Sequence, residues 1–357
     1  MPSHSPDLPE PAGTMSDTSE MTRYKVAVVG AGYFAQFHHE AWRRNPKTEL
    51  VAVADQDMSR ANQSGAAPYT DVEKMLRETA PDIVDIVTPP DAHLEMVEMA
   101  LRHAPKAVIC QKPFCGDLAA ARRATALASA KGIPLIVHEN FRFQPWYRAM
   151  KDAIEDRLIG DILQISFRLR PGDGQGERAY LDRQPYFQEM NKFLIHETGV
   201  HWIDTFRYLL GEPVAVYADL RQLNPAIKGE DAGFFLFEYT NGTRALFDGN
   251  RLIDHPADNH RLTMGECSLE GTTGEIRLLG DGTLHLRRKG EIASELIFTP
   301  ERTDRFGGDC IYALQESVIA ALRGDGPFEN LASDYLRVIE MEELIYKSAT
   351  EGRKLSC

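Results

Sequence analysis

No apolar run in this sequence of 357 residues is long enough to cross a membrane as a helix. Basic residues are also fewer than acidic ones: 40 Lys and Arg stand against 53 Asp and Glu, which gives a formal net charge of -13. A nucleic-acid-binding protein normally needs a basic face to meet phosphates, so this balance argues against that class. We therefore expect neither a membrane nor a nucleic acid as a partner. The net charge still allows a local basic pocket for a small anion.

Cysteine is rare as well, with five residues that are odd in number and lack the spacing of metal ligands. Cys110 and Cys115 are separated by four residues, which fits neither a Cys-x-x-Cys redox pair nor a zinc knuckle. A reducing, cytoplasmic setting is the simplest inference. Residues 1–22 are rich in Pro, Ser and acidic residues and have no apolar core of a secretion signal, so they are predicted to be a disordered extension.

Hydrophobic residues make up 43% and charged residues 26% of the chain, the balance of a globular protein long enough for two domains. Residues 23–141 alternate short, nearly continuous apolar runs with helical patterns. Such strands belong to a parallel sheet that is covered by helices on both faces. The strands are expected over 24–30, 49–55, 82–90, 106–113 and 133–140, with helices over 34–44, 92–103 and 118–131. The pattern predicts a doubly wound domain with its ligand crevice at the carboxyl ends of the strands.

Residues 142–357 have a different pattern, in which strands are joined by short turns such as Asn241-Gly242 and Asp281-Gly282. Turns of this kind are typical of antiparallel hairpins. A linking helix over 144–158 is expected to precede the strands, and two helices over 308–322 and 332–347 to follow them. The predicted fold class is therefore α/β: a doubly wound domain is followed by an α+β domain with an open, mostly antiparallel sheet.

The segment "VAVVGAGYFA" carries the glycine fingerprint of a dinucleotide site in its required context, between a strand and a helix. The first glycine permits the tight turn, the second lets the backbone approach a pyrophosphate, and the helix N-terminus supplies amides and a favourable dipole. Cofactor contacts are predicted for Gly30, Gly32, Tyr33, Phe34 and Ala35.

Asp55 ends the second strand, where a carboxylate accepts the ribose hydroxyls of NAD and repels the 2′-phosphate of NADP. The sequence thus favours NAD over NADP. Asp55 could instead be the N-cap of a helix.

Three further segments complete a pattern: "TPPDAH" at 88–93, "QKP" at 111–113 and "ETGVHWID" at 197–204. With them the sequence resembles the Gfo/Idh/MocA oxidoreductase family, from Tyr24 to the C-terminus. The resemblance implies an NAD-binding Rossmann domain and a second domain whose open sheet commonly forms oligomer contacts, so a homodimer or homotetramer is expected. Within the family, "HETGVHWIDTFRYL" is similar to sugar dehydrogenases that act on D-apiose.

The resemblance also implies site residues. Lys112, Glu197 and His201 fall on the positions of the family's catalytic lysine, acid and histidine. Gln111 stands where the family usually has Glu, and Glu197 stands where it often has Asp. These departures bear on the pose of the substrate more than on the class of reaction.

The chemistry of these residues suits hydride transfer, in which a substrate hydroxyl loses its proton as the hydride leaves. His201 is assigned as the general base, because the pKa of histidine lies near working pH. Lys112 would stabilise the developing alkoxide, and Glu197 would orient His201 or hold a substrate hydroxyl. On a helix, residues 197 and 201 share a face whereas 196 and 201 diverge, so a zinc site of the His-Glu-x-x-His kind is not expected and no metal is predicted.

Other polar residues are weaker candidates, each with a structural alternative. Thr88, Pro89, His93 and Gln111 are predicted to flank the cofactor, although a Pro-Pro before a helix is also common in loops. Asp204 could pair with Arg207 or hold another contact. His196 could line the pocket or pack in the core. Substrate contacts are predicted for Asn140, Arg142, Arg168, Tyr186, Lys192, His196, Glu197 and His201.

Together these features predict a cytoplasmic NAD-dependent dehydrogenase that oxidises a carbinol or anomeric hydroxyl of a small sugar or polyol. In the D-apiose version, the cyclic hemiacetal becomes a lactone. Two alternatives stay open: an NADP(H)-dependent reductase of the same family, and a non-catalytic NAD-binding sugar sensor or regulator.

Overall fold

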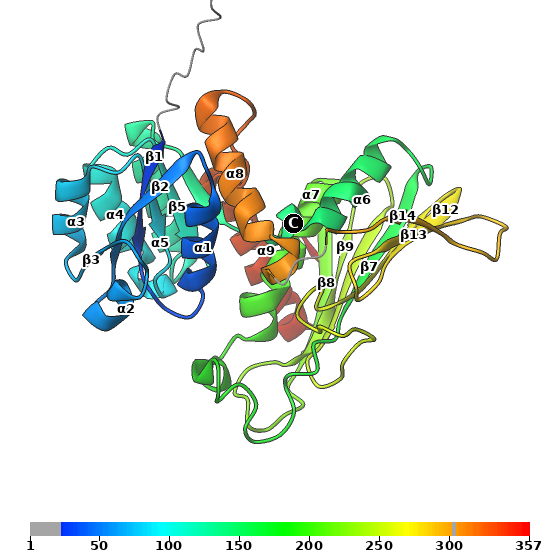
Figure 1. Ribbon diagram of the computed structural model, residues 1–357. Coiled ribbons are helices and arrows are strands. Elements are labelled where there is room, and N and C mark those ends of the chain that lie inside the picture. Colours follow the sequence, from blue (N-terminus) through cyan, green and yellow to red (C-terminus); the bar gives the residue numbers. More distant parts are fainter. Residues whose placement is uncertain (1–22, 302–304) are drawn as a thin grey trace, which may run out of the picture.

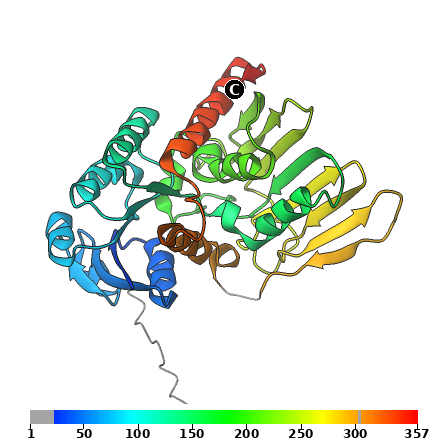
Figure 2. The same cartoon turned by 90° about the horizontal axis from the view of Figure 1, so that it is seen from above.

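The computed structural model describes residues 23–301 and 305–357, which form two β-sheets with helices packed around and between them (Figures 1 and 2). The extension predicted for residues 1–22 lies outside the described residues. No helix among the described residues is long and apolar enough to cross a membrane.

The first sheet has six parallel strands in the order β3-β2-β1-β4-β5-β6. The strands are β1 (Tyr24–Val29), β2 (Thr48–Ala54), β3 (Ala67–Tyr69), β4 (Ile83–Ile86), β5 (Ala107–Gln111) and β6 (Leu135–His138). The helices of this half are α1 (Ala35–Arg44), α2 (Met58–Asn62), α3 (Val72–Thr79), α4 (His93–Arg102) and α5 (Leu118–Lys131), with a short 3-10 turn at Pro90–Ala92.

The residues of β4, β5 and β6 are all buried, as expected for strands covered on both faces. The strand order and the direction of the strands confirm the predicted doubly wound fold. Three elements between 56 and 81 were not anticipated, because α2 has only five residues, β3 only three and α3 only eight. The apolar pattern of such short elements is too brief to indicate a period.

The second sheet has nine strands in the order β14-β13-β12-β11-β7-β10-β9-β8-β15. Its strands are β7 (Ile162–Leu169), β8 (Ala215–Arg221), β9 (Ala232–Glu238), β10 (Arg244–Asn250), β11 (Gly265–Gly271), β12 (Gly274–Leu278), β13 (Leu284–Arg288), β14 (Glu295–Phe298) and β15 (Leu355–Ser356). All pairs are antiparallel except β7 with β10, so the expectation of a mostly antiparallel sheet is confirmed.

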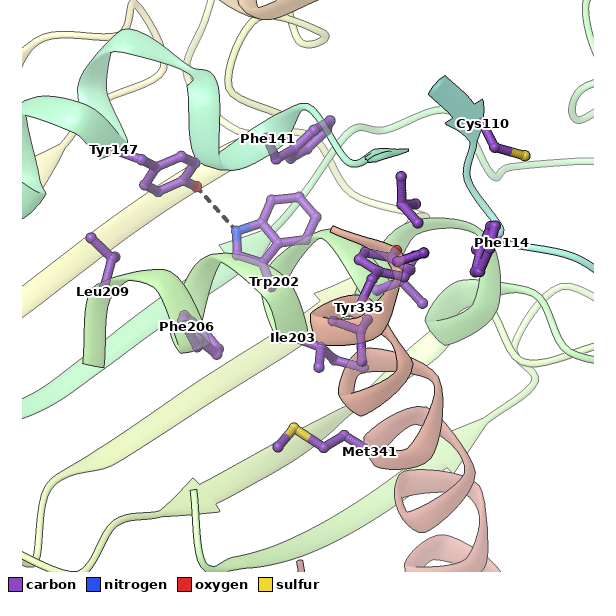
Figure 3. Close-up of a cluster of buried hydrophobic side chains, with 14 of the residues drawn as sticks. Cys110, Phe114, Phe141, Tyr147, Trp202, Ile203, Phe206, Leu209, Tyr335 and Met341 are labelled. Atoms are coloured by element: carbon purple, nitrogen blue, oxygen red, sulfur yellow. Dashed lines mark hydrogen bonds between the residues drawn. The ribbon is translucent and has the colours of Figure 1, made fainter. Parts of the chain in front are cut away.

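Helices pack against one face of this sheet (Figure 1). They are α6 (Pro145–Glu155), a π-helix (Leu194–Gly199) that continues as α7 (Val200–Leu210), and α9 (Ala332–Glu351); 3-10 turns lie at Phe141–Phe143 and Pro185–Glu189. Trp202 of α7 stacks on Phe167 of β7 with ring centroids 4.1 Å apart. Its indole N–H donates to the Tyr147 hydroxyl at 3.1 Å, so this buried polar group is satisfied (Figure 3).

The last part of the chain returns to the first sheet. Helix α8 (Cys310–Arg323) follows a 3-10 turn (Phe306–Gly308) and packs against α1, and Ile311 and Leu314 share a buried cluster with Val26 and Trp42. Helix α9 lies against α5 of the first half and β8 of the second. The chain after residue 141 therefore contributes to both cores and joins the two halves.

Candidate active site

The carboxyl ends of the parallel strands bring separate segments to one edge of the first sheet. Gly30 follows β1, Asp55 follows β2, Thr88 lies just beyond β4, Lys112 follows β5 and Glu139 follows β6. Because neighbouring parallel strands end on the same side of a sheet, residues that are far apart in the sequence meet here. Ligands of doubly wound folds bind at this edge.

The glycine loop has the geometry that a dinucleotide needs. Gly30 adopts φ +108°, and a Cβ there would lie 2.3 Å from the carbonyl oxygen of Val87, so no other residue fits the turn. At Gly32 a Cβ would meet nothing within 4 Å, and this residue lines a cavity. Helix α1 begins at Ala35, directly after the loop, and points its free amides to the same place.

Asp55 is held beside this loop rather than used to cap a helix. Its carboxylate accepts the backbone N–H of Ala31 at 2.8 Å and that of Asp57 at 2.9 Å. The N-cap of α2 is Asp57, whose side chain accepts from Ser59. The donors and the carboxylate present therefore fit NAD: the loop and the α1 N-terminus would hold the pyrophosphate, and Asp55 the adenosine ribose.

A cavity of about 720 Å³ extends from the glycine loop to the second sheet. Most of the predicted site residues line it: Gly32, Tyr33, Phe34, Thr88, Pro89, Gln111, Lys112, Asn140, Tyr186, His196, Glu197 and His201. Gly30, Ala35 and Asp55 belong to the glycine loop or adjoin it but do not line the cavity. The structure places four other predicted residues away from the cavity walls: His93, Arg142, Arg168 and Lys192.

His93 is a structural residue, which corrects the expectation that it flanks the cofactor. The side chain is fully buried, and the backbone N–H of Cys115 donates to its Nδ1 at 3.3 Å. The other nitrogen, Nε2, therefore carries the hydrogen and donates to the Thr88 carbonyl at 2.8 Å. Burial lowers the pKa of His93 to about 4. His93 thus ties the loop after β4 to the turn after Lys112.

Arg142 was predicted to contact substrate, but it forms a buried ion pair instead. Its Nε donates to Asp204 at 2.8 Å and its Nη2 at 2.5 Å, a two-pronged contact with one carboxylate. Burial raises the pKa of Asp204 to about 6, although Arg142 opposes that rise. Arg207, which sequence reasoning offered as the partner of Asp204, binds Glu212 and Asp334.

Replacing Arg142 with methionine is expected to destabilise the fold by about 3–5 kcal/mol, because a buried carboxylate loses its partner. Urea denaturation measures this change, and Arg77→Met on an exposed position of α3 is the matched control. The affinity for NAD and the KM for substrate should not change in the folded variant. A raised KM with unchanged stability would contradict this assignment and indicate that Arg142 contacts the substrate.

Arg168 and Lys192 are likewise exposed side chains that do not line the cavity. Arg168 is exposed on β7, and Lys192 is exposed with its ammonium 4.5 Å from the ring centroid of Tyr346. Neither side chain reaches the cavity, because the strand and the segment before the π-helix direct both outward.

Lys112 and Glu197 form an ion pair at the cavity wall. The ammonium donates to the Glu197 carboxylate at 3.0 Å and to the Glu197 carbonyl oxygen at 2.7 Å. The side chains are only 12% and 16% exposed, so solvent screens the pair weakly. An ammonium has three N–H donors, and two are used here. One donor is left for a substrate oxygen.

His201 and Glu139 form a second pair, and sequence reasoning did not identify Glu139. The Nδ1 of His201 lies 2.6 Å from the buried Glu139 carboxylate, and the imidazole stacks on Phe141 at 3.7 Å. Glu139 also accepts from the Phe141 backbone N–H and the Tyr335 hydroxyl, so its position is fixed. With Nδ1–H donated to Glu139, Nε2 is the atom that faces the cavity as an acceptor.

Burial lowers the pKa of His201 below its usual value. The charge of Lys112 acts in the same direction, whereas Glu139 opposes both. The histidine is therefore neutral at neutral pH and ready to accept a proton. The acid at the end of β6 was the available signal for Glu139, since that strand ends at the same edge as the strand before Lys112.

The four-residue spacing of Glu197 and His201 led to the expectation that Glu197 could orient His201, and this is wrong. Residues 194–199 form a π-helix, in which the Val200 N–H bonds to the Ile195 carbonyl five residues earlier. Glu197 turns to Lys112, and Glu139 takes the place beside His201. The four-residue spacing could not reveal these partners, because it implies a shared face only in a regular α-helix and not in a π-helix.

His196 lines the cavity beside this group and is held by α9. Its Nδ1 lies 2.8 Å from the Glu342 carboxylate. Although burial disfavours the charged form, Glu342 raises the pKa of His196 above its usual value. The pKa values of the two histidines are thus shifted in opposite directions: that of His196 is raised, which favours a donor to a substrate hydroxyl, and that of His201 is lowered, which favours the neutral base. Among the described residues, no group of His, Cys, Asp and Glu is arranged to hold a metal ion.

Gln111 fixes the start of the turn that carries Lys112. The side-chain oxygen Oε1 of Gln111 accepts the Lys112 backbone N–H at 2.7 Å, and its side-chain nitrogen Nε2 lies 3.0 Å from Nε2 of His38. His38 is buried and donates through Nδ1 to Asp85 at 2.8 Å. The His38 ring thus belongs to a buried chain of hydrogen bonds that runs from Asp85 to the backbone of Lys112.

The wall opposite the first sheet contains polar residues that sequence reasoning missed. Arg251 is almost fully buried, and it donates to Asp173 at 3.0 Å and to the Thr198 hydroxyl at 2.8 Å. Arg183 also contacts Asp173, at 3.3 Å. Since Thr198 lies in the π-helix, Arg251 ties that helix to the loop that carries Asp173. No local pattern marks these residues, which come from three separate segments.

Two family models match this chain. The one described as "Oxidoreductase family, NAD-binding Rossmann fold" covers residues 24–139, and the one described as "GFO/IDH/MocA C-terminal domain" covers residues 147–277. Their order is that of the two sheets described above, with the first domain ending at Glu139.

Individual proteins match over most of the chain. A D-apiose dehydrogenase from Paraburkholderia graminis is 32% identical, with 94% of this chain and 90% of the relative covered. A D-apiose dehydrogenase from Rhizobium rhizogenes is 29% identical, with 93% and 97% covered. The crystal structure of an oxidoreductase from Agrobacterium radiobacter in complex with NAD+, L-tartaric acid and magnesium superposes with a TM-score of 0.83 at 28% identity, covering 94% of this chain and 98% of that one.

Proposed function

Since this chain belongs to the Gfo/Idh/MocA family of NAD-binding oxidoreductases, we propose that it oxidises a carbinol or anomeric hydroxyl of a small sugar or polyol. One observation carries the proposal. A neutral histidine held by a buried carboxylate, His201 with Glu139, faces the same cavity as the Lys112 ammonium and the glycine loop. A base and a positive group beside a nucleotide site are what alcohol oxidation requires.

NAD, when bound, accepts the hydride. Nε2 of His201 takes the proton of the substrate hydroxyl, and Glu139 stabilises the imidazolium that results. The free N–H of Lys112 donates to the same substrate oxygen and stabilises its developing negative charge. Glu197 holds the ammonium in place through its own carboxylate. His196 and the hydroxyl of Tyr186, which also line the cavity, donate to other hydroxyls of the substrate.

The substrate class that we propose includes the branched pentose D-apiose, whose cyclic hemiacetal would be oxidised to a lactone. Two relatives named as D-apiose dehydrogenases, matched over more than nine-tenths of this chain, support this choice. Oxidation at an anomeric carbon needs a base, a group that stabilises the alkoxide and a hydride acceptor. The side chains around the cavity supply the first two.

A screen of NADH formation over pentoses, hexoses, inositols and polyols tests the proposal. We expect NADH to form with NAD and at least one of these compounds, and D-apiose is the first to try. Titration with NADP should give weaker binding than with NAD, because the Asp55 carboxylate repels a 2′-phosphate. Binding of sugars without any NADH formation would favour a sensor, and tighter binding of NADP would favour the reductase.

Replacing Glu139 with glutamine tests the assignment of His201. The negative charge of Glu139 raises the pKa of His201, so its removal should lower that pKa further. The acidic limb of the kcat/KM profile should then shift to lower pH, and kcat should fall by at least about tenfold because the base is weaker. Glu342→Gln, which removes the carboxylate beside His196, is the control and should leave this limb in place. An acidic limb that does not shift in Glu139→Gln would show that Glu139 does not set the pKa of the catalytic base.

We also propose that copies of this chain associate through the second sheet. Its face opposite α7 carries a half-buried apolar row in which Tyr217, Leu236 and Leu246 lie side by side on three paired strands. Leu246→Arg should dissociate the oligomer, as measured by light scattering after size-exclusion chromatography.

We further propose that the enzyme is located in the cytoplasm, because its five free cysteines fit a reducing compartment.

A further inference from the structure

Arg261 differs from the other cations of the cavity, because no carboxylate pairs with it. Lys112 is paired with Glu197, and Arg183 and Arg251 share Asp173. Arg261 lines the same cavity, and within residues 23–301 and 305–357 its guanidinium has no acidic partner. A cation without a carboxylate, in a chain with a net charge of -13, is available to an anionic ligand.

The position of Arg261 relates it to the glycine loop. The residue belongs to the segment between β10 and β11 of the second sheet, yet its Nη1 donates to the Tyr33 hydroxyl at 3.2 Å. Its guanidinium carbon lies 5.9 Å from the ring centroid of Phe306. The backbone N–H of Arg261 donates to the Asn259 side chain at 3.0 Å, which fixes the base of the residue. The second half of the chain thus reaches across the cavity to the first.

The glycine loop itself supplies no formal positive charge. Residues 30–39 contain neither Lys nor Arg, so the amides and the dipole at the N-terminus of α1 act alone. A pyrophosphate carries two negative charges. An unpaired guanidinium at the adjacent tyrosine is the group that is missing from this loop, and its planar set of donors suits phosphate oxygens.

We propose that Arg261 binds the pyrophosphate of NAD from the second domain and is an additional binding residue of the cofactor site. Before the cofactor binds, the Tyr33 hydroxyl accepts a hydrogen bond from this guanidinium and holds it at the mouth of the cavity. The inference rests on the assignment of NAD to this loop. It implies that the dinucleotide is held between the two halves of the chain rather than by the first half alone.

The test is equilibrium binding of NAD and of ADP-ribose, which keeps the pyrophosphate but lacks nicotinamide, measured by titration calorimetry. Arg261→Ala is expected to weaken both ligands by about 10- to 100-fold, the contribution of a hydrogen bond to a charged group. Arg261→Gln should lose as much, whereas Arg261→Lys should retain part of the affinity. The loss should shrink at high salt, because the contact is between charges. Arg77→Ala, which replaces an exposed arginine of α3 outside the cavity, should bind both ligands as the unchanged protein does.

Three results would overturn the proposal. Unchanged affinities in Arg261→Ala would show that the residue does not contact the cofactor. A loss for NAD without a loss for ADP-ribose would place the contact on the nicotinamide half. Failure of the unchanged protein to bind ADP-ribose or NAD would instead refute the cofactor assignment itself, so the two failures are distinguishable.

Discussion

Replacing Lys112 with methionine is expected to lower kcat by about 10²–10³-fold, the usual loss when a group that stabilises a developing oxyanion is removed. Methionine keeps the length of the side chain but brings no charge and no N–H. The Glu197 carboxylate would then lose its cation, and the substrate oxygen would lose its donor. Steady-state formation of NADH measures kcat, and titration calorimetry measures the binding of NAD. The Kd for NAD should stay close to that of the unchanged enzyme, because the pyrophosphate is bound elsewhere.

Lys192→Met is the matched control for this prediction. Lys192 lies in the approach to the same helix, but its ammonium rests on the Tyr346 ring outside the cavity. Its loss should change kcat little. Near-normal turnover in Lys112→Met would contradict the proposed stabilisation of the alkoxide. Equal losses in both variants would show that any loss of charge in this region impairs the enzyme.

Replacing His201 with alanine is expected to lower kcat/KM by about 10²–10⁴-fold, the range for loss of a general base. The acidic limb of the pH profile should disappear in the same variant. In the unchanged enzyme this limb should lie below the ordinary pKa of histidine, because burial lowers the pKa of His201. The base form is therefore present at lower pH than in free histidine. Added imidazole should restore part of the rate, since the vacated space is beside Phe141.

His196 provides the control, since it is also a histidine held by a carboxylate in the same cavity. In His196→Gln the KM for substrate should rise while the acidic limb persists. The opposite outcome would exchange the roles of the two residues: the limb would be lost in His196→Gln and kept in His201→Ala.

Several elements could be predicted because the cause of each lies within a short segment. The buried strands before Gly30, Asp55 and Lys112 show continuous apolar runs, and the glycine loop follows directly from its residues. The cavity contains Lys112 because a strand that ends at this edge of the sheet carries it there. Such features depend on the residues next to one another in the chain.

Other features depend on contacts between distant segments. Glu139 and His201 are separated by 62 residues, and so are Arg142 and Asp204. Both pairs are buried, but His201 of the first pair lines the cavity whereas neither member of the second does. Sequence reasoning assigned Arg142 to the substrate and overlooked Glu139. Both residues follow β6, and only the packing of α7 against this segment decides which one meets the site.

The sequence by itself therefore determined the presence of the two sheets and the nucleotide loop, and it pointed to Lys112, Glu197 and His201 as the candidate catalytic residues, since each is encoded by local period, turn chemistry or motif. The tertiary structure decided their partners. Glu230 accepts the backbone N–H groups of Phe193 and Ile195 and so caps the π-helix. In that helix the Glu197 carboxylate contacts the Lys112 ammonium, and His201 is hydrogen-bonded to Glu139 instead. A hydrogen-bond partner is chosen by distance in space, and the spacing of residues along a single helix cannot specify it.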